Sequence, residues 1–175
     1  MFTETGTGTG TVERLPLTDP AALAAVELIY EEARLLDDKR YRDWEALWDE
    51  GETRYVLPMS REATDFDAVL NYVNDDAVMR HRRVERMAGG YAGAVESVGR
   101  TVRTVSRFTA DRTGDDEVRV TSTEIVAAYQ RGEHQLWAAE MVHHIVGREC
   151  GPRIRTKIVH LIDAEHTLRT CGFLL

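Results

Sequence analysis

The chain has 175 residues, of which 43% are hydrophobic and 30% charged, and its formal net charge is −8. A chain of this length can build a core without disulfides, and its acidity argues against binding of a nucleic-acid backbone, which needs a basic surface. No apolar run is long enough to cross a bilayer and residues 1–11 lack signal-peptide features, so we expect a cytoplasmic protein that binds neither nucleic acid nor membrane.

The chain begins with a segment of low apolar content. Residues 6–11 are a Gly-Thr repeat, and so few apolar groups cannot offset the entropy lost on ordering. We therefore predict a flexible tail over residues 1–17. The rest, residues 18–175, has no internal repeat or visible boundary and is expected to be a single domain.

A helix is predicted over about residues 20–37. Thr18 or Asp19 can cap its first turn, and Pro20 already has the helical φ angle. Apolar residues then recur at spacings of three and four, which predicts one stripe facing a core. The residues of that predicted stripe are Leu23, Val26, Tyr30, Ala33 and Leu36, while those expected in solvent are Glu27, Glu31 and Glu32.

Two more helices and one strand are predicted before residue 90. Residues 41–48 place their aromatic side chains on one helical face, and these are interpreted as core, with a hydrophobic ligand pocket as the alternative. Residues 53–57 alternate like a strand. The acidic run at residues 74–76 can cap a third, charged helix, which ends at Gly89.

From residue 100 onward the pattern is that of β-strands. Four long runs rich in Val, Ile and Thr are separated by turns of hairpin length, which predicts an antiparallel meander. The runs are residues 101–109, 117–131, 135–148 and 154–163. The third run is largely apolar on both faces, so we expect helices to cover one face and something else, for which a partner subunit is one candidate, to cover the other.

Helices followed by strands, without interleaving, indicate an α+β fold. We expect three N-terminal helices packed on a strongly curved antiparallel sheet, which together form a cone. A cone of this kind often leaves a pocket between its helices and its sheet.

Several segments resemble the beta (small) subunits of Rieske-type aromatic-ring-hydroxylating dioxygenases, members of the NTF2-like superfamily. The similarity runs over about residues 20–175. It rests on residues 32–48 (EARLLDDKRYRDWEALW), 55–58 (YVLP), 71–76 (NYVNDD), 157–163 (KIVHLID) and 172–175 (GFLL). The resemblance implies a non-catalytic small subunit that supports a catalytic alpha subunit in an alpha3beta3 hexamer, with beta–beta contacts forming a trimer. It also implies that a Rieske 2Fe-2S cluster and a mononuclear iron lie on the alpha subunit.

A Rieske centre needs two Cys and two His ligands, and the two cysteines of this chain lack the sequence context of such ligands. Cys150 and Cys171 lack the spacing to histidine that such a site requires, and both are interpreted as buried thiols. Glu140, His144 and His160 can share one strand face, but hydrogen-bonded structural residues are the favoured interpretation over a metal or acid/base site. We therefore assign no catalytic, cofactor-binding or metal-binding residue to this chain.

Two alternative functions stay open at this point. The same cone supports dehydratases, isomerases and cyclases, so the chain can be a stand-alone enzyme acting by acid/base catalysis on a small hydrophobic substrate. The candidates for its acid/base pair are Asp38, Tyr55, His81, His144 and His160. The other alternative is a binding module without catalysis, for which a filled cone and an exposed apolar sheet face would be evidence.

Overall fold

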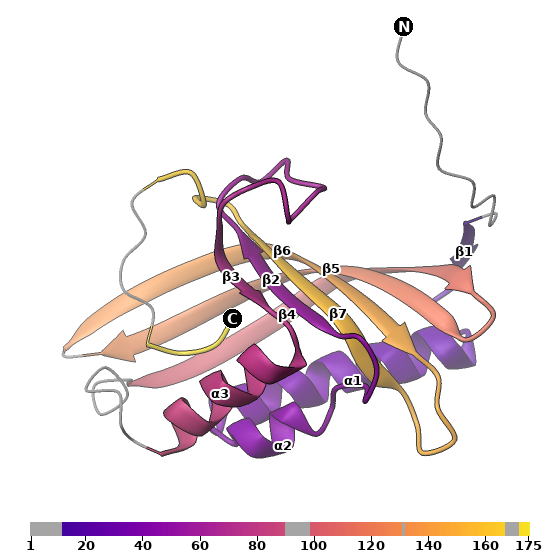
Figure 1. The fold of residues 1–175 in the computed structure, drawn as a ribbon, viewed down its shortest axis with the longest axis horizontal. Helices are drawn as coiled ribbons and strands as arrows, with labels where there is room; N and C mark the ends of the chain where they lie inside the picture. The colour runs from indigo at the N-terminus through magenta and orange to yellow at the C-terminus, as the bar shows by residue number, and fades with distance from the viewer. Residues whose placement is uncertain (1–11, 90–98, 131, 167–171) are drawn as a thin grey trace, which may run out of the picture.

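The computed structural model describes residues 12–89, 99–130, 132–166 and 172–175. Three helices lie together on one side of a long, twisted sheet (Figure 1). The helices are α1 (Pro20–Asp37), α2 (Tyr41–Glu45) and α3 (Ala77–Ala88). The strands are β1 (Glu13–Leu15), β2 (Arg54–Pro58), β3 (Asn71–Asp75), β4 (Arg100–Gly114), β5 (Glu117–Gln130), β6 (Glu133–Val146) and β7 (Arg153–Leu161).

The seven strands form one sheet in the order β1-β4-β5-β6-β7-β2-β3. The predicted α+β class and the antiparallel meander of β4 to β7 are confirmed. The sheet is antiparallel, as predicted, except that β2 and β7 run parallel. The main-chain N–H of Ile154 donates to the carbonyl oxygen of Leu47, and the N–H of Asp49 donates to the carbonyl oxygen of Ile154, at 2.9 Å each. These bonds hold the start of β7 beside the segment that leads into β2, so the two strands run in the same direction.

Two strands lie where none was predicted. Residues 13–15, assigned to the flexible tail, form β1, which pairs with β4 and buries Leu15; residues 1–11 of that tail lie outside the described residues. β3 pairs with β2 as a short antiparallel hairpin. Its Asn and Asp residues are poor strand formers, and pairing with β2 outweighs that preference.

Helix α1 begins where predicted, but a different face is buried. Asp19 caps it, because its carboxylate accepts hydrogen bonds from the main-chain N–H of Ala21 at 2.9 Å and of Ala22 at 3.3 Å. Leu23 and Tyr30, predicted to be in the core, are about half exposed. The buried face consists of Ala22, Ala25, Leu28, Ile29, Glu32, Ala33, Leu35 and Leu36. Glu32, predicted to be in solvent, therefore lies within the core.

The inner face of the sheet and the aromatic residues around α2 form that core. The face of β6 that carries Trp137, Ala139, Met141, His143 and Ile145 is buried. Trp44, Trp48 and Tyr55 pack edge to face, with ring centroids 5.5 to 6.1 Å apart, an arrangement that stabilises aromatic clusters beyond simple burial. The interpretation of the aromatic residues in 41–48 as core is confirmed, because Tyr41, Trp44 and Trp48 are buried. Within the described ranges, none of the helices is long and apolar enough to cross a membrane.

Candidate functional site

The centre of the cone contains a buried group of charged side chains, which we call the Glu32 cluster: Glu32, Trp44, His143 and Lys157. Glu32 comes from α1, Trp44 from α2, His143 from β6 and Lys157 from β7. The Glu32 carboxylate accepts hydrogen bonds from Trp44 Nε1 at 2.8 Å, from Lys157 Nζ at 2.9 Å and from His143 Nε2 at 2.9 Å. Each of the four residues is at most 2% exposed, so the cluster ties α1 and α2 to the sheet away from water.

The electrostatics of the cluster keep Glu32 ionised. Burial by itself would raise the pKa of Glu32, because a carboxylate loses its hydration. The Lys157 ammonium and His143 outweigh that effect, and the pKa of Glu32 is held below its ordinary value of 4.5. All three donors point at the same carboxylate, so its oxygens are already satisfied by protein groups. This arrangement suits a structural ion pair better than a proton-transferring residue, which must be able to reach a substrate.

A hollow of about 300 Å³ lies between the sheet and residues 173–175, and we call it the inner hollow. Its walls come from β2, β3, α3, β6 and β7. They are lined by Tyr55, Leu57, Tyr72, Val73, Arg83, Trp137, Leu161, Phe173, Leu174 and Leu175. The lining is mostly aromatic and aliphatic, as in sites for small organic molecules.

Two side chains hold residues 173–175 against the sheet. The Tyr55 hydroxyl donates to the main-chain oxygen of Leu175 at 2.6 Å and accepts from its N–H at 3.2 Å. Arg103, which is buried, donates to the main-chain oxygen of Leu174 and forms an ion pair with Asp37 at 2.5 Å. These contacts fix one wall of the inner hollow in place.

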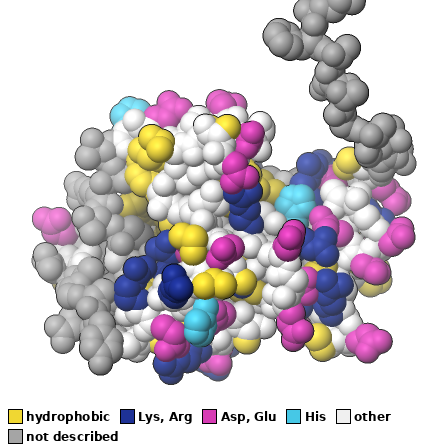
Figure 2. Space-filling view, in the orientation of Figure 1, with side chains coloured by type: hydrophobic (Ala, Val, Ile, Leu, Met, Phe, Trp, Pro, Cys, Tyr) yellow, Lys and Arg dark blue, Asp and Glu magenta, His cyan; other side chains and the backbone are white. Residues whose placement is uncertain are grey.

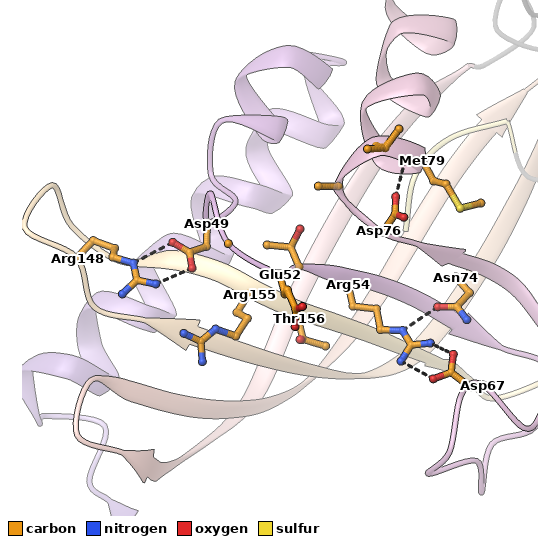
Figure 3. Close-up of a pocket in the computed structure, with 14 residues that line it drawn as sticks. Asp49, Glu52, Arg54, Asp67, Asn74, Asp76, Met79, Arg148, Arg155 and Thr156 are labelled. Carbon is orange, nitrogen blue, oxygen red and sulfur yellow. Dashed lines mark hydrogen bonds and ion pairs between the residues drawn. The ribbon is translucent and has the colours of Figure 1, made fainter.

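A larger groove of about 1090 Å³ lies on the outside, and we call it the outer groove. Figure 3 shows an arginine bound to a carboxylate at each end of it: Arg148 to Asp49, and Arg54 to Asp67. The Arg148 hydrogen bonds hold the pKa of Asp49 below its ordinary value. Arg155, between them, pairs with Glu117 at 2.5 Å. Since the arginines of the groove are already neutralised in pairs, it is poorly suited to binding a phosphate or carboxylate.

Acidic and basic side chains also lie close together on the rest of the visible surface. Figure 2 shows acidic and basic side chains interspersed across one face of the molecule, with apolar side chains among them. Arg80, part of the predicted basic helix, is buried and lies over the Trp48 ring at 4.1 Å, and Arg83 pairs with Asp75. The arginines of α3 thus serve partly as internal partners of acidic and aromatic groups.

The predicted acid/base candidates are not brought together. Asp38 lies at the end of α1 and pairs with Arg34 at 3.1 Å, half exposed. His81 is exposed on α3, with Nδ1 3.2 Å from Glu45. Neither side chain reaches the interior of the cone.

The other candidates also lie apart. His144 is on the outer face of β6 and binds Glu117 at 3.0 Å. His160 is on the outer face of β7, beside Phe66, and burial lowers its pKa below the ordinary 6.5. Tyr55 alone among the five candidates lines the inner hollow, and its hydroxyl already binds Leu175.

The structure also bears on the predicted metal ligands and thiols. Glu140 lies opposite His160 in the sheet but pairs with Arg61 at 3.0 Å. Among the described residues, no three His, Cys, Asp or Glu side chains form a group that could hold a metal ion. Cys150 is exposed rather than buried, because it lies in the turn before β7 and not in a strand; Cys171 is outside the described residues.

The residues that sequence reasoning missed are Glu32, Lys157 and Arg103. One signal was available for Glu32: it lies three or four positions from Leu28, Ile29, Leu35 and Leu36, at the centre of an apolar stripe. Lys157 is 125 residues away from Glu32 in the sequence. No local pattern reveals that the two side chains meet.

Comparisons with known proteins agree with this architecture. Residues 31–166, more than half of the chain, match the model of the ring hydroxylating beta subunit family. The chain is 29% identical over 111 residues to the beta subunit of an N,N-dimethyl phenylurea N-demethylase from Sphingobium sp.. It is 33% identical over 110 residues to the small oxygenase component of the p-cumate 2,3-dioxygenase system of Pseudomonas putida. Each match covers 61% of this chain and only 62% and 59% of those relatives.

A solved structure shows the same fold. The beta subunit of the benzoate 1,2-dioxygenase from Burkholderia mallei superposes with a TM-score of 0.66 at 20% identity, over 84% of this chain and 93% of that one. At such low identity the superposition supports the fold alone. Membership of a family rests on the match of residues 31–166 to the family model. This chain belongs to the ring hydroxylating beta subunit family.

Proposed function

We propose that this chain is the non-catalytic small subunit of a ring-hydroxylating dioxygenase and supports a catalytic alpha subunit that carries the Rieske 2Fe-2S cluster and the mononuclear iron. The observation that carries the proposal is the family match over residues 31–166. The Glu32 cluster supports it, because the polar groups at the centre of the cone bind one another instead of facing a substrate. A stand-alone acid/base enzyme is disfavoured, since its candidate residues lie apart.

The outer face of the sheet supports an assembling role. An apolar area, which we call the outer patch, crosses β4, β5, β6 and the end of β7. Val102 is paired with Ala127, which is paired with Leu136, and Ile125 lies in the next row. The outer patch comprises Val102 (65% exposed), Ile125 (46%), Ala127, Leu136 (73%) and Ile162 (60%). A contiguous apolar area of this kind marks a surface that a partner covers.

The proposal is tested by co-expression with a candidate alpha subunit and pull-down on a tag attached to that subunit. We expect the wild-type chain to co-purify. Leu136→Glu should reduce recovery at least tenfold, because it places a charge in the apolar centre of the contact. Leu70→Glu is the matched control, since Leu70 is equally exposed at 77% but lies outside the outer patch. Failure of the wild-type chain to bind any alpha subunit encoded beside it would overturn the proposal.

The finer part of the proposal is an alpha3beta3 hexamer with a trimer of beta subunits, located in the cytoplasm. The exposed thiol of Cys150 supports a reducing compartment. Native mass spectrometry of the co-purified complex measures the stoichiometry. Equal copies in a complex of six subunits are expected, and any other ratio would contradict this part while leaving the pairing of the two subunits intact.

A further inference from the structure

The wall of the inner hollow includes a polar group that none of the described residues satisfies. Trp137 lines the hollow and is 6% exposed, and its indole Nε1–H has no hydrogen-bond partner in the part of the chain that the structure describes. A buried donor without a partner costs about 1–3 kcal/mol, so most buried donors have one. The ring itself packs edge to face against Phe173, with centroids 5.9 Å apart.

The remaining polar groups in the wall are already paired. Arg83 binds Asp75 through two hydrogen bonds of 2.5 and 2.9 Å. The Tyr72 hydroxyl donates to the main-chain oxygen of Ala164 at 2.9 Å, and the Tyr55 hydroxyl binds Leu175. A charged ligand would therefore lose its hydration in this hollow without gaining a counter-charge.

We propose that the inner hollow is a binding site for a small, neutral, single-ring aromatic molecule with one hydrogen-bond acceptor. The volume of about 300 Å³ is at the lower end for ligand sites, which limits the occupant to about one ring with a short substituent. The aromatic walls stack against the ring, and the acceptor takes the Trp137 N–H. This site is on the small subunit itself and is independent of any iron on a partner, so the inference goes beyond the proposed function.

Two probes of nearly equal shape test whether binding depends on a hydrogen-bond acceptor. Acetophenone carries a carbonyl acceptor, whereas ethylbenzene has none. The chain has three tryptophans, so its indole N–H signals are few enough to resolve in a 1H–15N spectrum, and Trp137→Phe assigns one of them. We expect acetophenone to shift the Trp137 indole signal to lower field, whereas the Trp44 signal, whose N–H already binds Glu32, should stay in place.

Affinity measurements on the purified full chain complete the test. Ligand-observed NMR should show that Trp137→Phe weakens acetophenone binding about fivefold, the effect of one net hydrogen bond, and leaves ethylbenzene binding unchanged. Val73→Phe, which fills the hollow from its β3 wall, should abolish binding of both probes. The Trp44 indole signal and the circular dichroism spectrum report that each variant is folded.

Three results would overturn the proposal. These are no shift of the Trp137 indole at millimolar acetophenone, equal loss of both probes in Trp137→Phe, or undiminished binding in folded Val73→Phe. None of them bears on pairing with an alpha subunit, which is measured separately by pull-down.

Discussion

The Glu32 cluster makes a quantitative prediction about stability. Glu32→Gln keeps the size and one acceptor oxygen of the side chain but removes its charge, which leaves the Lys157 ammonium buried beside a neutral group. The Lys157 Nζ atom is 2.9 Å from the carboxylate, so the gross attraction is about 6 kcal/mol at an effective dielectric constant of about 20. Part of it offsets the cost of desolvating both ions. Removing one partner of a buried pair costs about 3–5 kcal/mol.

A double-mutant cycle measures this coupling. Urea unfolding at neutral pH, followed by tryptophan fluorescence and circular dichroism, gives the free energy of unfolding of Glu32→Gln, Lys157→Met and the combined variant. We expect each single change to lower it by about 3–5 kcal/mol. The combined variant should lose much less than the sum, because no uncompensated charge is then left in the core.

Glu31→Gln is the matched control. Glu31 precedes Glu32 on the same helix and also forms an ion pair, with Arg34 at 2.6 Å, but both groups are about half exposed. Exposed pairs contribute little, so this variant should be nearly as stable as the wild type. If Glu32→Gln loses no more stability than Glu31→Gln, or if the two core changes are simply additive, then the cluster is not a coupled ion pair and the reasoning fails.

Two other changes have clear expected outcomes. Tyr55→Phe removes the hydroxyl that binds both main-chain groups of the buried Leu175 and should lower the free energy of unfolding by about 1–3 kcal/mol; equal urea midpoints for Tyr55→Phe and wild type would contradict this. Burial lowers the pKa of His160 below 6.5 in the folded chain. As the pH falls, the imidazole of the unfolded chain therefore binds a proton before that of the folded chain does. The stability contributed by the neutral ring is complete above pH 6.5 and is lost as the pH falls below 6.5. His160→Gln should therefore show a smaller fall in Tm between about pH 7.5 and pH 5.5, and an identical fall would refute the assignment.

Acid should weaken the cluster as well, in a lower pH range. The pKa of Glu32 is depressed in the folded state despite burial, because Lys157 and His143 hold the carboxylate ionised. Its contribution is therefore present above pH 4.5, the ordinary value, and is lost as the pH falls below it. The loss of stability from Glu32 can therefore be told apart from that of His160, which begins at a pH about two units higher.

Much of the fold could be predicted from local signals. The start of α1 follows from Asp19 and Pro20, and the meander of β4 to β7 follows from long β-branched runs separated by turns. The alternation along β6 also divided its residues correctly between two faces, because the side-chain period of a strand is two, but both faces are largely apolar and the pattern did not indicate which one is inner. These features depend on neighbours in the sequence, which the sequence displays directly.

The rest depends on contacts between distant segments. Helix α1 carries two possible apolar stripes, and choosing between them required knowing that Glu32 has buried partners 111 and 125 residues away. A glutamate is almost never fully buried unless it is paired, so the wrong stripe was the natural choice without that knowledge. The parallel pairing of β2 with β7 is set in the same way, by main-chain bonds between residues 47–49 and Ile154.

A buried ion pair is a costly way to stabilise a core, because apolar side chains of the same volume often do as well or better. Its directional hydrogen bonds, however, accept only one arrangement of α1, α2, β6 and β7, so it can select one packing among several that an apolar core would tolerate. The combined Glu32→Gln and Lys157→Met variant tests this interpretation. If the cluster selects the packing, this variant should stay folded and keep its circular dichroism, while its amide hydrogens in α1 and β7 exchange faster than those of the wild type. Unchanged exchange would show that apolar packing alone determines how the helices sit on the sheet.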